Sequence, residues 1–258
     1  MLGTSTTPYD LRFRLLDIPV RVHPLFWLTA ALLGWRDQDL FRVIMWIACV
    51  FLSILVHEFG HGLMAKYFHG SPSVVLYAMG GLCYSQGERT PSQRLAVLFG
   101  GPGAGFLLCG LVMLVASLVY GISPGEHVET LLELLGLTSN LPSALDRIPS
   151  RTPALLYLFM VQINFFWGLI NLLPVWPLDG GQATQVVLTM FDRRHGVRRG
   201  HIISLLTAGI IAVFAASRED YFLALMFGIL AFMNYQSLQS LHQASSFGLD
   251  QDDDWWRG

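Results

Sequence analysis

The residues of this sequence that most clearly indicate chemistry are His57-Glu58-Phe59-Gly60-His61. Residues four apart on an α-helix lie on one face, so the two imidazoles can bind the same Zn²⁺. Glu58 lies beside them, where its carboxylate can take a proton from a water molecule that the metal activates. Histidine is scarce, with 8 in 258 residues, so the spacing is seldom met by chance. The motif predicts one zinc site per chain, with Glu58 as its general base.

Two histidines do not complete a catalytic zinc site, which usually has three protein ligands and one open position. Asp179 is the candidate for the third ligand. It follows Pro174 and Pro177, which end an apolar helix, and it precedes Gly180-Gly181, which free the backbone. A helix broken in this way can turn an aspartate inward at membrane depth. The alternative is that Asp179 caps the helical stretch that follows it.

The elements that must position these residues have the composition of a membrane protein. Hydrophobic residues make up 53% of the chain and charged residues 13%, against about 25% charged in soluble domains. A span needs about 20 mostly apolar residues. We expect an all-α polytopic membrane protein with about six transmembrane helices, of which the first predicted span is the weakest. These helices form a single core of residues 1–242, and residues 243–258 form a flexible acidic tail. The predicted spans are residues 22–35, 40–67, 95–120, 154–173, 201–216 and 221–238.

The motif of two histidines and a glutamate falls inside the second predicted span. Ionisable side chains are unfavourable in the hydrocarbon region, so such a cluster indicates function. Residues 68–93 connect this span to the next and contain the run Val74, Val75, Leu76 and Tyr77, then Gly80-Gly81, then Leu82 to Tyr84. Short β-rich runs around a glycine pair predict a membrane-associated hairpin or small sheet. In the external loop 121–153, the stretch 131–137 predicts a short interfacial helix.

Charge and cysteine content narrow the class further. The net charge of −2 gives no electrostatic reason to expect a nucleic-acid partner. The three cysteines, Cys49, Cys83 and Cys109, have no spacing typical of a disulfide framework or a cysteine zinc site. Eleven of the 16 Lys and Arg residues fall on the inner side if both termini are cytoplasmic, which favours that orientation.

The motif at His57 to His61, together with Asn171-Leu172-Leu173-Pro174-Val175-Trp176-Pro177-Leu178-Asp179-Gly180-Gly181, resembles the site-2 protease family, peptidase family M50. The second motif of that family reads N-x-x-P-x-x-P-x-D-G, and every fixed position is present. The similarity extends to Val20-Arg21-Val22-His23-Pro24, Gly80-Gly81 and Gly100-Gly101-Pro102. Many members have an asparagine a few residues after that Gly-Pro, where this chain has Gly103-Ala104-Gly105.

The resemblance implies an intramembrane zinc metalloprotease that cuts transmembrane segments of other membrane proteins. It implies His57, His61 and Asp179 as zinc ligands. Asn171 is expected either near the metal, holding substrate or polarising its carbonyl, or only at the helix break, where it satisfies freed carbonyl groups. The β-rich segment is expected to pair with an unwound substrate, and either Val74–Tyr77 or Leu82–Tyr84 to offer the free edge.

The expected partners are a transmembrane protein substrate, the lipid bilayer and a regulatory membrane protein. The compact core, without PDZ or CBS domains, suggests a prokaryotic inner membrane. Two alternatives stay open. A membrane zinc transporter would need polar residues stacked along a pathway, and an inactive substrate-binding homologue is disfavoured by the intact Glu58. We expect a structural role for His23 and no catalytic role for the other histidines at helix ends or in loops, His69, His127, His195 and His201.

Overall fold

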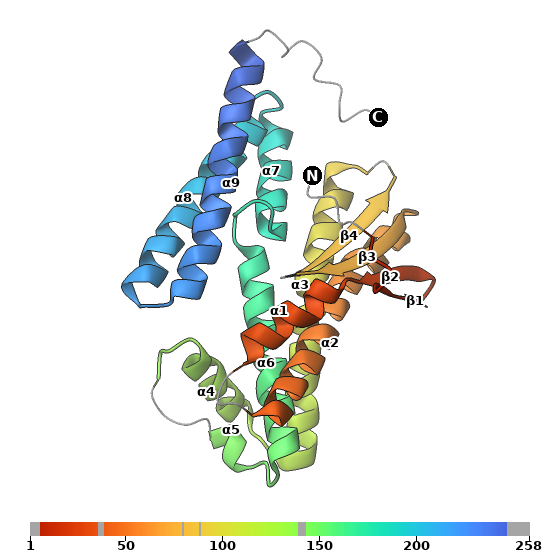
Figure 1. Ribbon diagram of the computed structural model, residues 1–258, viewed down its shortest axis with the longest axis vertical. Coiled ribbons are helices and arrows are strands. Elements are labelled where there is room, and N and C mark those ends of the chain that lie inside the picture. Colours follow the sequence, from red (N-terminus) through yellow and green to blue (C-terminus); the bar gives the residue numbers. More distant parts are fainter. Residues whose placement is uncertain (1–5, 36–38, 79, 88, 139–142, 247–258) are drawn as a thin grey trace. The chain divides into compact units, whose positions relative to one another are not determined.

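The computed structural model describes residues 6–35, 39–78, 80–87, 89–138 and 143–246. The predicted acidic tail lies outside the described residues from position 247 onward. The elements, labelled in Figure 1, are β1 (Leu11–Leu15), β2 (Ile18–Val22), α1 (Pro24–Gly34), α2 (Leu40–Tyr67), β3 (Ser71–Tyr77), β4 (Gly80–Gln86), α3 (Pro91–Tyr120), α4 (Pro124–Leu134), α5 (Ser143–Asp146), α6 (Arg151–Leu172), α7 (Asp179–Phe191), α8 (Gly196–Ser217) and α9 (Tyr221–Ser246).

Within the described part of the chain, five helices are long and apolar enough to cross a membrane: α2, α3, α6, α8 and α9. They confirm the helices predicted for the last five spans. The first predicted span, 22–35, is instead the 11-residue helix α1, with Val22 in the strand before it. At 1.5 Å per residue α1 rises about 16 Å, roughly half of the hydrocarbon thickness.

The chain divides into two units. The first holds Met1–Arg89 and Phe99–Leu169, and the second holds Thr90–Leu98 and Ile170–Gly258. The division passes through α3 and α6, so each unit takes part of these helices. The single core predicted for residues 1–242 stays a prediction.

The first unit contains a four-stranded sheet of the order β1-β2-β3-β4 among the described residues. The predicted hairpin is present as β3 and β4, which pair antiparallel. The N-terminal hairpin β1-β2 adds to it, with β2 parallel to β3. The sequence reasoning missed this hairpin, although Ile18, Val20 and Val22 alternate with more exposed residues in the pattern of a half-buried strand.

The order of the strands corrects one expectation. Val74, Val75 and Leu76 were one of the two candidates for a free edge that could bind a substrate strand. They pair with β4 on one side and with Val20, Arg21 and Val22 on the other. β3 is an interior strand because the N-terminal hairpin covers it, and Tyr77 ends that same strand. The edge beyond β3 belongs to β4, the other candidate.

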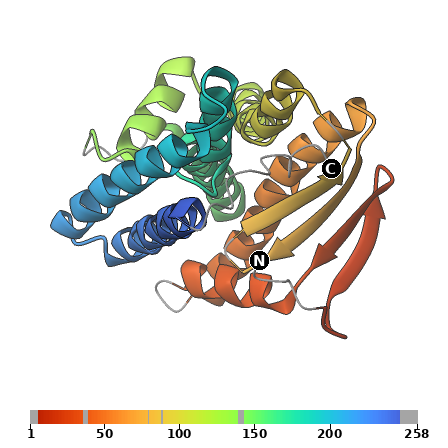
Figure 2. The same ribbon diagram turned by 90° about the horizontal axis from the view of Figure 1, so that it is seen from above.

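The main core of the first unit lies between the sheet and its helices. Ile18, Val20 and Leu76 of the sheet pack with Phe26 of α1 and Phe59 of α2, all at most 6% exposed. Figure 2 shows the sheet alongside α2, which contacts both β3 and β4. Burial of this apolar surface fixes one face of α2 against the sheet.

The connection between α3 and α6 also contains a helix, as the sequence predicted. α4 begins at Pro124 rather than in the stretch 131–137, because Ser123 and Glu126 form a capping box at its start. His127 of α4 is 7% exposed and bonds Ser117 Oγ and Tyr157 Oη, each at 2.8 Å. Its burial lowers the pKa of the His127 imidazole below the usual 6.5.

The second unit consists of the end of α6, the proline-containing segment after it, and helices α7 to α9. Helices α8 and α9 lie side by side, as Figure 2 shows, and α7 packs against α8. Val175, Ala208 and Phe227 form the buried centre of this unit. An irregular segment therefore shares a core with two membrane-length helices.

Candidate metal centre

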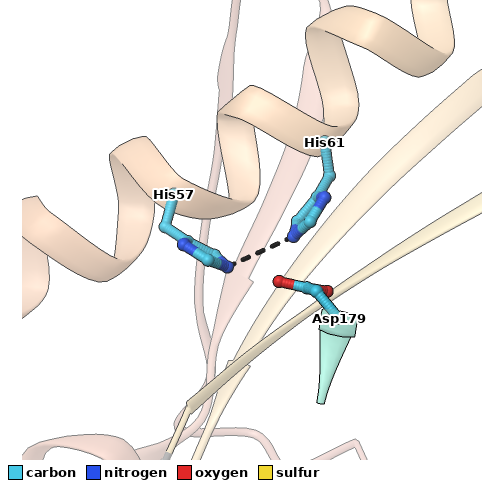
Figure 3. A group of neighbouring side chains, drawn as sticks. All are labelled: His57, His61 and Asp179. Carbon is cyan, nitrogen blue, oxygen red and sulfur yellow. Dashed lines mark hydrogen bonds between the residues drawn. The ribbon is translucent and has the colours of Figure 1, made fainter. Parts of the chain in front are cut away.

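Helix α2 presents His57, Glu58 and His61 on a buried face, where they are 2%, 4% and 6% exposed. The two imidazoles, one helical turn apart, turn their Nε2 atoms toward each other at 3.2 Å, as Figure 3 shows. The ring centroids are 4.9 Å apart and the ring planes meet at 81°. The spacing of four residues therefore places two ligand nitrogens on the same face of α2, close enough to share one ion, as the sequence predicted.

This geometry fits a zinc ion. Two nitrogens that each lie about 2.0–2.1 Å from zinc at a tetrahedral angle are about 3.3 Å apart. The Nε2 atoms of His57 and His61 are 3.2 Å apart, which matches the spacing of two nitrogen ligands on one zinc ion. Binding of both rings to one cation also accounts for two imidazole nitrogens facing each other in a buried place.

Helix α3 passes close to this face of α2 because glycines occupy the contact on both helices. A Cβ at Gly60 would lie 2.1 Å from the carbonyl oxygen of Gly100. A Cβ at Gly101 would lie 2.2 Å from Nε2 of His61. The glycines of the Gly100-Gly101-Pro102 motif therefore provide the space that the His61 imidazole occupies.

Strand β4 approaches the same face in the same way. A Cβ at Gly81 would lie 2.2 Å from Cγ of Glu58. At the neighbouring Gly80, a Cβ would meet only the Trp167 ring, at 3.4 Å. The glycine pair of the β-rich segment thus brings an edge strand directly against the candidate general base.

A second buried polar pair joins α2 to α6 one turn before His57. The Asn164 side chain, 2% exposed, donates from Nδ2 to Ser53 Oγ at 2.8 Å and to the Met160 carbonyl at 2.8 Å. A Cβ at Gly105 would lie 3.9 Å from Asn164 Oδ1. The sequence reasoning noted the absence of an asparagine after Gly101-Pro102 but missed Asn164, whose place in the apolar stretch of α6 was the available signal.

Asp179 and Asn171 belong to the second unit. Asp179 is the first residue of α7 and is half-buried, and Asn171 is buried near the end of α6. Leu178 occupies the N-cap position of α7, and its side chain forms no capping hydrogen bond. Asp179 follows in the first turn of the helix.

The segment before Asp179 is folded tightly onto the start of α7. A Cβ at Gly180 would lie 2.2 Å from the Leu172 carbonyl oxygen, and one at Gly181 would lie 2.2 Å from the Trp176 nitrogen. The Leu178 amide donates to the Val175 carbonyl at 2.9 Å. These contacts explain why two glycines follow Asp179.

Among the remaining histidines, His23 has the structural role expected of it. It is the N-cap of α1, where its Nδ1 accepts a hydrogen bond from the Leu25 amide at 3.1 Å. His201 is not at a helix end, because α8 begins at Gly196, and it is only 7% exposed. The structure brings His57, Glu58 and His61 together within the first unit and places Asp179, Asn171 and His201 in the second.

Comparison with known proteins agrees with these features. The model of peptidase family M50 matches residues 45–216. The chain is 25% identical over 187 residues to a zinc metalloprotease of Methanocaldococcus jannaschii, covering 70% of this chain and 46% of that protein. It is 25% identical over 196 residues to the stage IV sporulation protein FB of Bacillus subtilis, covering 75% and 54%. The chain thus spans about half the length of these curated relatives.

The fold is that of a solved structure, the site-2 protease from Methanocaldococcus jannaschii. The TM-score is 0.58 at 21% identity, and the match covers 89% of this chain and 95% of that one. The family match covers more than half of the chain and includes both sequence motifs. The first motif lies on α2 and the second begins at the end of α6, and both of these helices have membrane length. The chain is an integral membrane protein of peptidase family M50.

Proposed function

We propose that this chain is an intramembrane zinc metalloprotease that hydrolyses peptide bonds in or near transmembrane segments of membrane proteins. The observation that carries the proposal is the convergence of two Nε2 atoms at 3.2 Å beside a buried glutamate, on a helix of membrane length. Relatives that bear the name zinc metalloprotease support the same chemistry.

In this proposal His57, His61 and Asp179 hold one Zn²⁺. Each offers one ligand atom, two imidazole nitrogens and a carboxylate oxygen, which are types that zinc takes in catalytic sites. Three protein ligands leave one position open. When bound, the ion lowers the pKa of water to about 7 and polarises a carbonyl group.

Glu58 then acts as the general base. Its carboxylate takes a proton from the attacking water, whose oxygen forms a bond to the scissile carbonyl carbon. Glu58 returns that proton to the nitrogen of the leaving amine as the carbon–nitrogen bond breaks. The contact with Gly81 holds the glutamate side chain between β4 and its own helix.

The substrate is held along the outer edge of β4, Gly80–Gln86. A transmembrane helix shields its peptide bonds with its own hydrogen bonds, so the scissile bond must first become extended. An edge strand can replace the lost backbone bonds, and β4 pairs only with β3 among the described strands. Because Gly81 abuts Glu58, a strand added to this edge lies near the general base. Proline substitutions along β4 should lower cleavage while sparing zinc binding, and unchanged turnover would refute this role.

The remaining expectations belong to the same proposal. Asn171 either holds the substrate carbonyl or satisfies carbonyl groups freed where α6 ends. Both termini face the cytoplasm, and the membrane is a prokaryotic inner membrane. A regulatory membrane protein joins the substrate as a partner.

The test uses the purified full chain in detergent with a fluorescein-labelled unstructured protein as probe substrate. We expect chelator-sensitive cleavage by the wild-type chain, and Glu58→Gln should keep its zinc and lose at least about 10²-fold in rate. Membrane proteins that accumulate in cells expressing Glu58→Gln then identify natural substrates. Zinc flux in proteoliposomes without any cleavage would instead establish the transporter alternative.

A further inference from the structure

The segment Leu173–Leu178, here called the proline loop, leads from α6 to Asp179 and cannot form a helix. Pro174 and Pro177 flank Trp176, so the loop lacks two backbone donors and the regular bonding of a helix. At membrane depth a backbone group without a partner is unfavourable, so irregular segments there need partners from other parts of the protein.

Both backbone groups of Trp176 find such partners in side chains of α8 and α9. The Trp176 amide donates to Ser204 Oγ at 2.9 Å, and Ser204 in turn donates to the Gly200 carbonyl at 2.8 Å. The Trp176 carbonyl accepts from Asn234 Nδ2 at 2.8 Å. Ser204 and Asn234 are both 0% exposed.

The orientation of the Asn234 amide is fixed by its own surroundings. Its Nδ2 donates to two carbonyl groups, those of Trp176 and Leu230, both at 2.8 Å. Its Oδ1 lies 2.8 Å from His201 Nδ1, which must therefore carry the proton. A flipped amide would direct its oxygen at two carbonyl oxygens. The His201 ring also packs against the Trp176 ring, with centroids 5.5 Å apart.

Three polar side chains in membrane-length helices thus converge on Trp176, three residues before Asp179. Polar and ionisable residues within spans are rare and indicate function. We infer that His201, Ser204 and Asn234 form a clamp that positions Asp179 for zinc binding. This inference rests on the proposed function, because it assumes that Asp179 is a zinc ligand.

The route from the clamp to Asp179 is short and rigid. A Cβ at Gly181 would lie only 2.2 Å from the Trp176 backbone nitrogen, so the loop and the first turn of α7 are in direct contact. The side chain of Gln182 donates from Nε2 to the Pro177 carbonyl at 2.9 Å, and the backbone N–H of Gln182 donates to the Leu178 carbonyl at 3.0 Å. A shift of the Trp176 peptide therefore moves the residue that begins α7. The clamp residues are positioning residues and touch no reacting atom.

The test is a double-mutant cycle on zinc affinity, measured on the full chain by competition with a chelator. Asn234→Leu removes both donors and should weaken zinc binding by about 10-fold, as loss of a group that orients a ligand does. Asp179→Asn should weaken it at least as much. In the Asp179→Asn background, Asn234→Leu should have no further effect, because its only route is through Asp179.

Controls separate positioning from stability. Ser237→Ala removes a hydroxyl that, among the described residues, donates to the Met233 carbonyl of its own helix α9, and it should leave zinc affinity unchanged. Ser204→Ala should weaken zinc binding, whereas Ser204→Thr, which keeps the hydroxyl, should restore it. The visible spectrum of the Co²⁺-loaded chain should change with Asn234→Leu and not with Ser237→Ala.

The outcomes are distinct. If Asp179→Asn weakens zinc binding and Asn234→Leu does not, the clamp is refuted and the proposed function stands. If Asn234→Leu weakens binding equally in both backgrounds, it acts without Asp179 and the inference is also refuted. If Asp179→Asn itself binds zinc as the wild type does, the ligand assignment in the proposed function fails.

Discussion

The contact between Gly101 and His61 yields the sharpest prediction. An alanine Cβ at position 101 would lie 2.2 Å from Nε2, 2.5 Å from Cε1 and 2.7 Å from Cδ2 of His61. Real Cβ atoms essentially never approach within 3.0 Å of another atom, so the imidazole must retreat by about 1 Å to regain ordinary contact. The nearest atom, and so the one displaced most, is the proposed ligand nitrogen itself.

A displacement of about 1 Å in a catalytic group can reduce the rate by about 10²-fold, equivalent to about 2.7 kcal/mol of barrier. We expect Gly101→Ala to lose about that much activity on the probe substrate and about 10-fold or more in zinc affinity. Gly103→Ala is the matched control, since a Cβ there meets no atom within 4 Å. Both variants add one methyl group to α3, two residues apart.

The assays are zinc affinity by chelator competition, the cleavage rate at saturating zinc, and thermal unfolding. Overpacking alone destabilises by about 1–3 kcal/mol, so the melting temperature of Gly101→Ala is measured alongside. Zinc affinity equal to wild type in a folded Gly101→Ala protein would show that His61 need not lie where the structure has it. Equal losses in Gly103→Ala would show that the effect is not specific to this contact.

Two further predictions follow from the same unit. Gly81→Ala places a Cβ 2.2 Å from Glu58 Cγ and should lower the cleavage rate about 10²-fold while zinc affinity stays within twofold. The control Gly80→Ala, whose Cβ meets only the Trp167 ring at 3.4 Å, should change neither quantity. A loss of zinc affinity in Gly81→Ala would contradict the assignment of Glu58 as a base rather than a ligand. The pKa of His127 is lowered in the folded state, so below pH 6.5 the unfolded chain binds a proton at this imidazole more readily than the folded chain does. The free energy of unfolding therefore falls as the pH drops through that range. Thermal unfolding between pH 7.5 and 5.5 should show a smaller decline for His127→Gln than for the wild type, and an identical decline would refute the role of this imidazole.

The metal-binding half of the site could be predicted from sequence because it is local. Four residues of helix are enough to place His57 and His61 on one face, and no distant contact is needed. The long apolar stretches likewise predicted the five membrane-length helices, since their length follows from bilayer thickness. The spacing of Asp179 alone was compatible with a zinc ligand or a helix cap, and the family resemblance favoured the ligand.

What the sequence could not supply depends on contacts between distant segments. The identity of the edge strand required the N-terminal hairpin, whose β2 pairs with β3 across about 50 residues and leaves β4 outermost. The need for glycine at positions 81 and 101 appears only when β4 and α3 are placed against α2. Asn234 is one polar residue in an apolar stretch, and its role depends on a carbonyl group 58 residues earlier in the chain.

The central claim is that one zinc ion joins two imidazoles of α2 to the carboxylate that begins α7. Zinc affinity and zinc X-ray absorption, measured on the wild type, His61→Ala and Asp179→Ala, test it most directly. We predict one zinc per chain with outer-shell scattering from two imidazoles, one imidazole in His61→Ala, and zinc binding weakened at least about 10-fold in Asp179→Ala with both imidazoles retained. Wild-type affinity in Asp179→Ala, or a zinc environment without two imidazoles in the wild type, would contradict the account.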